Sequence, residues 1–162
     1  MKILVFSDSH SSLRFMNRCV DKLKPDAIVH LGDCYDDGET LSETYPHIPL
    51  HQVAGNCDKY RAPIHAREFL CYTVGGVMLY MTHGHNHRVK QGLYSLLADA
   101  RQNKVAAVLY GHTHIPDCHQ ELDGLWVLNP GSASHSAGIL ETDGREITAC
   151  YLLTEKDLEE SL

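Results

Sequence analysis

The chain has 162 residues, and its 14 Lys and Arg against 21 Asp and Glu give a formal net charge of −7 with histidine neutral. This length suits one domain over residues 1–162, with a core large enough to hold a rigid site without disulfides. An acidic balance of this size disfavours broad electrostatic binding to long nucleic-acid duplexes or to an anionic membrane surface.

The cysteines and the N-terminus bear on the cellular compartment. The six cysteines are spread along the chain with no C-x-x-C pair, so neither a zinc ribbon nor a disulfide framework is indicated. This usage favours reduced thiols and a cytoplasmic protein. The apolar run at residues 3–6 is too short for a signal peptide or a membrane span, and we interpret it as a first buried strand.

The predicted strand at residues 3–6 runs into Asp8 and His10, which are two positions apart. Side chains two apart in extended backbone point to the same side. A helix is expected next, because Ser11 and Ser12 can cap it and apolar residues then recur at helical spacing. The apolar positions are Leu13, Met16, Cys19, Val20 and Leu23.

Two further strands end in the same way. Residues 27–31 form an apolar run that closes on Gly32 and Asp33, and residues 50–54 are followed by Gly55 and Asn56. A short polar helix is expected between them, over residues 39–44. This alternation predicts a parallel sheet with polar residues at the carboxyl ends of the strands, where open α/β sheets bind ligands.

The pattern changes after residue 68. Residues 69–73 and 77–81 flank Gly75-Gly76 and predict a hairpin, whose second strand runs into His83, Gly84 and His85. A helix around residues 93–100 and a strand at 105–110 then lead to His112 and His114. The remaining segments are expected to be further strands of a second sheet, at 125–128, 137–141 and 146–153, followed by a loose helix or frayed end at 155–162.

Five strand ends therefore carry oxygen and imidazole donors, with no obligatory thiolate. Such a set suits two divalent ions that share one bridging carboxylate. Two ions about 3.5 to 4 Å apart clamp both ends of an in-line displacement at phosphorus, and a bridging water becomes the nucleophile near neutral pH. The candidate ligands are Asp8, His10, Asp33, Asn56, His83, His112 and His114.

The motif order D-x-H, G-D, G-N, H-G-H, G-H-T-H resembles that of the calcineurin-like metallophosphoesterase superfamily. Gly55-Asn56-Cys57-Asp58 and Gly111-His112-Thr113-His114-x-Pro116 are similar to the forms in its small bacterial and archaeal phosphodiesterase branch. The resemblance covers residues 3 to about 132 and implies an α/β fold, a four-layer αββα sandwich of two mixed sheets flanked by helices. It also implies a dinuclear site, for which we expect manganese, with iron, zinc or nickel as alternatives.

The resemblance divides the seven candidate ligands between the two ions. One ion is assigned to Asp8, His10 and His114. The other is assigned to Asn56, His83 and His112. Asp33 is expected to bridge them.

Candidate catalytic residues accompany these ligands, namely Asn56, Cys57 and His85. Many members of the superfamily carry histidine at the position of Cys57, where it acts on the leaving-group oxygen. A thiol with a pKa of about 8.5 is a poorer proton donor than imidazolium, so we expect a bias towards good leaving groups. Filling space beside the metals is the alternative for Cys57. His85 is expected to contact phosphate, donate a proton or hydrogen-bond to a ligand.

Other polar residues receive structural interpretations. Asp58 is expected to cap a helix or to orient a neighbour. Asp36 and Asp37 are interpreted as an exposed acidic turn, with attraction of a third ion as the alternative. Residues 129–132, Asn-Pro-Gly-Ser, are typical of a turn.

The leading hypothesis is a metal-dependent phosphodiesterase that acts on a small phosphate ester. A phosphomonoesterase or a nucleotide pyrophosphatase with the same site is the alternative enzyme. A scaffold or interaction module of the same fold is the alternative from another class, although such a protein has no reason to keep all seven donors. Neither a membrane nor a long duplex is expected as a partner, and a homo-oligomer is left open.

Overall fold

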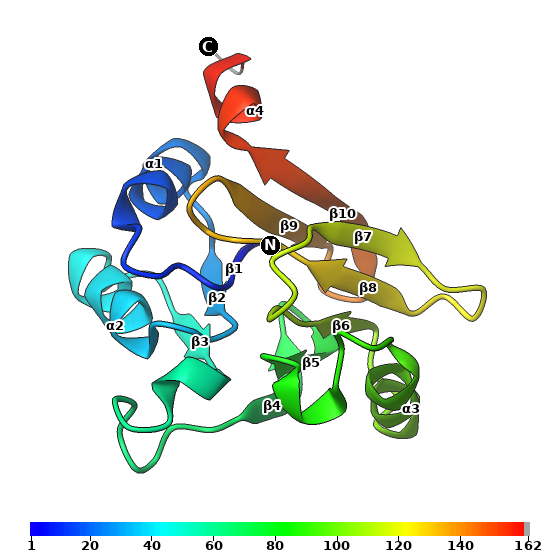
Figure 1. Ribbon diagram of the computed structural model, residues 1–162. Helices are drawn as coiled ribbons and strands as arrows, with labels where there is room; N and C mark the ends of the chain where they lie inside the picture. Colours follow the sequence, from blue (N-terminus) through cyan, green and yellow to red (C-terminus); the bar gives the residue numbers. More distant parts are fainter. Residues whose placement is uncertain (161–162) are drawn as a thin grey trace.

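Figure 1 shows the computed structural model, in which residues 1–160 are described. Two five-stranded sheets face each other, with helices on their outer faces, so the predicted αββα sandwich is confirmed. The first sheet has the order β10-β9-β1-β2-β3, and its strands are β1 (Lys2–Phe6), β2 (Ala27–His30), β3 (Leu50–Gln52), β9 (Ser136–Thr142) and β10 (Ile147–Thr154). The second sheet has the order β4-β5-β6-β8-β7, and its strands are β4 (Phe69–Val74), β5 (Val77–Thr82), β6 (Ala107–Leu109), β7 (Asp117–Gln120) and β8 (Trp126–Asn129).

The apolar run of β1 is buried on both faces. Ile3 and Val5 belong to the core between the two sheets, whereas Leu4 and Phe6 belong to the core beneath the helices of the first sheet. Successive side chains of a strand point to opposite faces, so an unbroken apolar strand needs a covering layer on each side. The composition of this strand therefore already implies a covering layer on each face of its sheet, which the second sheet and the helices provide.

The helices cover the outer faces of the sheets (Figure 1). They are α1 (Leu13–Leu23), α2 (Tyr35–Thr44), α3 (Tyr94–Gln102) and α4 (Glu155–Glu160), with short 3-10 turns η1 (Asn56–Asp58) and η2 (His85–His87). Helix α1 buries Met16, Cys19 and Val20 of the predicted stripe together with Phe15, while Leu13 and Leu23 are partly buried. The N-cap residue is Ser12, and it makes no side-chain capping hydrogen bond. None of the helices within residues 1–160 has the length and apolar character that crossing a bilayer requires.

The C-terminal strands correct the predicted topology. Strands β9 and β10 join the first sheet rather than the second, and β9 pairs antiparallel with β1, with Ile3 opposite Leu140. Strand β9 is buried on both faces, with Ile139 under the helices and Leu140 between the sheets, so it occupies an interior position beside β1. Strand β7 was not predicted, since its half-buried polar residues show no apolar alternation.

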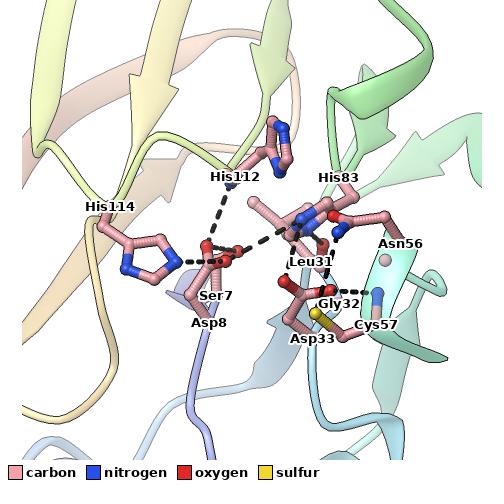
Figure 2. A network of polar contacts seen from close by, with 12 residues as sticks. Ser7, Asp8, Leu31, Gly32, Asp33, Asn56, Cys57, His83, His112 and His114 are labelled. Carbon is pink, nitrogen blue, oxygen red and sulfur yellow. Dashed lines mark hydrogen bonds and ion pairs between the residues drawn. The ribbon is translucent and has the colours of Figure 1, made fainter. Parts of the chain in front are cut away.

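Parallel pairing brings the carboxyl ends of the central strands together. Strands β1, β2 and β3 run parallel in the first sheet, and β5, β6 and β8 run parallel in the second. The loops that follow β1, β2, β3, β5 and β6 are the loops that carry the seven candidate ligands. The fold therefore places all of these loops at the same end of the sandwich, as Figure 2 shows for six of the seven ligands.

Replacing Leu79 by alanine is expected to lower the free energy of unfolding by about 2 to 5 kcal/mol, because the side chain is fully buried between the sheets and its loss leaves a cavity. The matched control is Leu122→Ala at a fully exposed leucine, which should change stability by less than about 0.5 kcal/mol. Urea unfolding in the presence of a chelator measures both. Equal stability of the two variants would contradict the assignment of the inter-sheet core.

Candidate metal centre

Six of the seven candidate ligands converge in two overlapping groups, and Figure 2 shows Asp8, Asp33, His83, His112 and His114 of them. Within each group, the ligand atoms all lie within 4.8 Å of one another. The first group is Asp8, His10, Asp33 and His114, and the second is Asp33, His83 and His112. Asp33 belongs to both groups, which is the position that a bridging carboxylate needs.

The imidazole nitrogens face the carboxylate oxygens at short range. His114 Nε2 lies 3.1 Å from Asp8 Oδ1, and His83 Nε2 lies 3.4 Å from Asp33 Oδ2. His10 Nε2 and His114 Nε2 are 3.4 Å apart. Groups that normally serve as ligand atoms therefore point at one small volume rather than at separate partners.

Two of these atoms are buried and lack a hydrogen-bond partner in the described part of the chain, Asp8 Oδ1 and His83 Nε2. The other polar atoms of the same side chains are satisfied. Asp8 Oδ2 accepts bonds from the Ser7 hydroxyl at 2.6 Å and the His112 amide at 3.0 Å, and His83 Nδ1 lies 2.8 Å from the Leu31 carbonyl oxygen.

An unsatisfied buried polar atom costs about 1 to 3 kcal/mol. A cation bound by Asp8 Oδ1 and His83 Nε2 would remove this cost. A proton on His83 Nδ1, directed at Leu31, leaves the Nε2 lone pair free to bind a cation. The mixture of carboxylate oxygen and imidazole nitrogen suits manganese, iron, zinc or nickel ions. The residues present therefore fit a divalent metal centre.

The protonation states of the ligands also suit a cation. Burial tends to raise the pKa of Asp33, but the neighbouring His83 imidazole and the hydrogen bond from the Cys57 amide outweigh this effect and hold the pKa well below its usual range. Burial lowers the pKa of His112, which keeps the imidazole neutral. Ligands must be deprotonated to coordinate a metal, and these two are.

Five of the seven candidate ligands sit in the left-handed backbone region. The φ angles are 53° at Asp8, 45° at His10, 58° at Asp33, 69° at His112 and 61° at His114. Residues with a Cβ hold such conformations at a cost of about 1 to 3 kcal/mol, and they persist where the surroundings over-determine them. The backbone strain is thus concentrated at the residues whose side chains point toward the candidate metal centre.

Two glycines let the ligand loops come into contact. A Cβ at Gly55 would lie 2.2 Å from Asp33 Oδ1, and a Cβ at Gly111 would lie 1.9 Å from the Ser7 hydroxyl oxygen. Both distances are far shorter than a van der Waals contact. The glycines of the G-N and G-H-T-H motifs therefore provide space for the carboxylates rather than ligand atoms.

Comparison with known proteins decides the family. A profile of the calcineurin-like phosphoesterase superfamily domain matches residues 1–157. The chain belongs to this superfamily. The resemblance that the sequence motifs predicted is therefore confirmed.

The relatives include both bacterial and eukaryotic proteins. A probable metallophosphoesterase of Bacillus subtilis, YsnB, is 30% identical over 138 residues, which cover 82% of this chain and 75% of that protein. A protein of Streptococcus pneumoniae described as a predicted phosphoesterase has a TM-score of 0.70 at 26% identity, with 95% of this chain and 97% of that chain covered. Vps29 of Entamoeba histolytica, solved with zinc, has a TM-score of 0.74 at 20% identity, with 95% and 99% covered, and shows the shared fold.

The remaining candidates border the second group of ligands. Asn56 is exposed at the start of η1 and lies beside His83 and Asp33 in Figure 2. The Cys57 amide donates a hydrogen bond to Asp33 Oδ1 at 3.0 Å, and the thiol is exposed. Residual burial and the neighbouring Asp33 raise the pKa of Cys57, so its thiol stays protonated at neutral pH.

His85 lies beside the same group of ligands. Its ring centroid lies 5.5 Å from that of His83 and 6.2 Å from that of His112. Its Nδ1 atom is buried without a hydrogen-bond partner among the described residues, and Nε2 is 4.0 Å from Glu68 Oε1. Burial lowers the pKa of His85, which favours a neutral ring at pH 7. A neutral ring is suited to hydrogen-bonding a substrate oxygen.

Asp58 fulfils both roles considered for it. Its buried carboxylate accepts four backbone N–H bonds at 2.7 to 2.9 Å, from Gly55, Asp33, Cys34 and Tyr35. One of these donors, Tyr35, is the first residue of α2, which explains why this helix begins before the predicted residue 39. The carboxylate thus caps a helix and ties the loop after β3 to the loop that carries Asp33.

The interpretation of Asp36 and Asp37 as an exposed acidic turn was wrong in two respects, because both residues lie in helix α2 and Asp37 is buried. The Asp37 carboxylate is buried and accepts the Ser9 hydroxyl at 2.6 Å and the Ser11 amide at 2.8 Å. Ser9 also contacts His30 Nε2 at 3.0 Å, and burial lowers the pKa of His30 to about 4, which keeps it neutral. This network holds the loop between Asp8 and His10, and it links residues too far apart in sequence for a spacing rule to detect.

The segment at residues 129–132 does more than form a turn. Asn129 Nδ2 donates to the Thr113 hydroxyl at 2.9 Å and to the Gly111 carbonyl at 3.3 Å, bracing the loop that carries His112 and His114. The Ser132 hydroxyl donates to the Asp8 carbonyl at 3.0 Å. The sequence signal for these contacts was the position of the segment directly after a strand.

Asp58→Asn is expected to weaken manganese binding by about 10- to 100-fold, because an amide nitrogen would face backbone N–H donors and release the loops that aim Asp33. Asp36→Asn is the matched control, since Asp36 is exposed in α2, the helix that Asp58 caps, and its change should leave the affinity unaltered. Calorimetric titration of the metal-free proteins measures both affinities. Equal affinities in the two variants would remove Asp58 from its positioning role.

Proposed function

We propose that the protein is a cytoplasmic, metal-dependent phosphodiesterase that hydrolyses small phosphate esters at a dinuclear site. The observation that carries this proposal is the sharing of Asp33 between two ligand groups that also contain the orphaned Asp8 Oδ1 and His83 Nε2 atoms. Membership of the phosphoesterase superfamily supports the reaction class. The free state of all six cysteines supports the compartment.

One ion is assigned to Asp8, His10 and His114 in this proposal, the other to Asn56, His83 and His112, with Asp33 between them. When bound, two divalent ions supply Lewis acidity to the phosphate and generate a nucleophile from water near neutral pH. The protein holds these side chains in fixed orientations through the hydrogen bonds of Asp8, Asp33 and His83.

The side chains at the rim handle the substrate. Asn56 is exposed beside the second group and presents amide donors to a phosphate oxygen. His85 lines the same hollow as Asn56, and burial lowers its pKa, so it offers a neutral imidazole there. Cys57 carries a protonated thiol whose raised pKa makes it a weak acid, so departing groups that need little protonation are favoured.

A scaffold function is the second candidate, because several structural neighbours are Vps29 proteins, one of them named vacuolar protein sorting 29. The sequence identities with these neighbours are only 16 to 20%. A protein recruited for its surface alone does not need the buried, unsatisfied ligand atoms that this chain retains. The observations therefore favour the enzyme.

With added manganese, the protein is expected to hydrolyse bis(p-nitrophenyl) phosphate faster than p-nitrophenyl phosphate, and a chelator should abolish both activities. Asp33→Asn should lower kcat/KM by about 100-fold or more, since the shared carboxylate is lost. His47→Ala, at an exposed histidine, is the control and should retain activity. Release of nitrophenolate measures all of these rates. A failure of turnover with manganese, iron, zinc and nickel alike would favour the scaffold.

Cys57→His is expected to retain activity on nitrophenyl esters and to raise kcat on alkyl diesters, because an imidazolium protonates a poor leaving group better than a thiol does. The ratio of kcat for the alkyl substrate to kcat for the nitrophenyl substrate is the measurement. Cys57→Ser serves as the control and should leave that ratio unchanged. A metal-loaded but inactive Cys57→His protein would show that the thiol has another role.

A further inference from the structure

A basic hollow opens beside the candidate metal centre. Its volume is about 450 Å³, and its lining residues are His85, Arg88, Lys90, Gln91 and His112. His112 also belongs to the second ligand group, and His85 lies next to it. A phosphate held at the metals would therefore sit at the mouth of this hollow.

The backbone that carries the two cations is well anchored. Arg88 follows η2 in the left-handed conformation, with φ 52°, and its amide donates to the His85 carbonyl at 3.1 Å. Val89 lies between the two cations in the sequence and is buried. It packs so closely against Gly84 that a Cβ added there would lie 2.9 Å from a Val89 methyl carbon. The side chains of Arg88 and Lys90 thus flank a fixed residue and remain exposed in the hollow.

The charge of the hollow is not neutralised by the protein. Among the described residues, no carboxylate lies within ion-pair distance of Arg88 or Lys90, and none lines the hollow. The chain as a whole carries a formal charge of −7. Two unpaired cations beside the candidate metal ligands are therefore a local positive patch on an acidic protein.

We propose that Arg88 and Lys90 bind a second phosphate group of the substrate, so that the physiological substrates are phosphate esters that carry another phosphate. This inference rests on the proposed phosphoesterase function. A guanidinium offers a planar fork that matches phosphate oxygens, and an ammonium adds a mobile point charge. A hollow of about 450 Å³ is within the size range of small-molecule sites.

Calorimetry with two nucleotide probes tests this assignment on the manganese-loaded protein. Adenosine 3′,5′-bisphosphate should bind about 10-fold more tightly than adenosine 5′-monophosphate, and Arg88→Ala and Lys90→Ala should each reduce that ratio by about 3- to 10-fold. The ratio should also shrink as salt is raised, because both cations are exposed. Arg145→Ala is the control, since Arg145 is an exposed cation in the turn after β9, at the far end of the first sheet.

Two results would overturn the inference: equal binding of both probes by the unaltered protein, or an affinity ratio that neither Arg88→Ala nor Lys90→Ala changes. Because the titration reads binding, it is independent of turnover. Hydrolysis of bis(p-nitrophenyl) phosphate with an unchanged ratio would reject the phosphate-binding role and leave the enzyme in place. A ratio that depends on both cations in a protein without turnover would reject the hydrolase instead.

Discussion

The site depends on the convergence of the Asp8, Asp33 and His83 side chains on one small volume, where their hydrogen-bonding capacity is only partly satisfied by other described residues. Two of their polar atoms are buried without a hydrogen-bond partner among the described residues, and each costs about 1 to 3 kcal/mol until a cation arrives. The left-handed backbone at the ligands, the glycines without room for a Cβ, and the Asp58 carboxylate all serve this convergence. The folded chain stores this cost because two sheets of buried strands hold the loops in place.

Most of the architecture, and the clustering of the candidate ligands, could be predicted from local signals. Unbroken apolar runs such as residues 3–6 indicate strands covered on both faces, and the polar residues directly after them indicate a site at the carboxyl ends. These signals involve neighbouring residues, so a single sequence contains them. The structure brings six of the seven candidate ligands together.

The rest depends on contacts between distant parts of the chain. Asp37 is buried because Ser9 and Ser11, 28 and 26 positions away, approach it from another loop. Likewise, β9 joins the first sheet because its Leu140 fits the core opposite Ile3, and an apolar strand alone does not reveal which of two sheets it will join. Local patterns identify the elements, whereas pairing and burial are settled only in three dimensions.

The position of β9 beside β1 has a consequence for how the chain folds while the ribosome synthesises it. Strand β1 (Lys2–Phe6) is synthesised long before its antiparallel neighbour β9, which begins at Ser136. Until that late segment emerges, one edge of β1 exposes unpaired backbone amides and carbonyls, and an open edge of this kind invites pairing with other chains. Asp8 is therefore synthesised well before the strand that leads to it has both neighbours, so we expect the ligand loops to be fixed in place only after β9 has emerged.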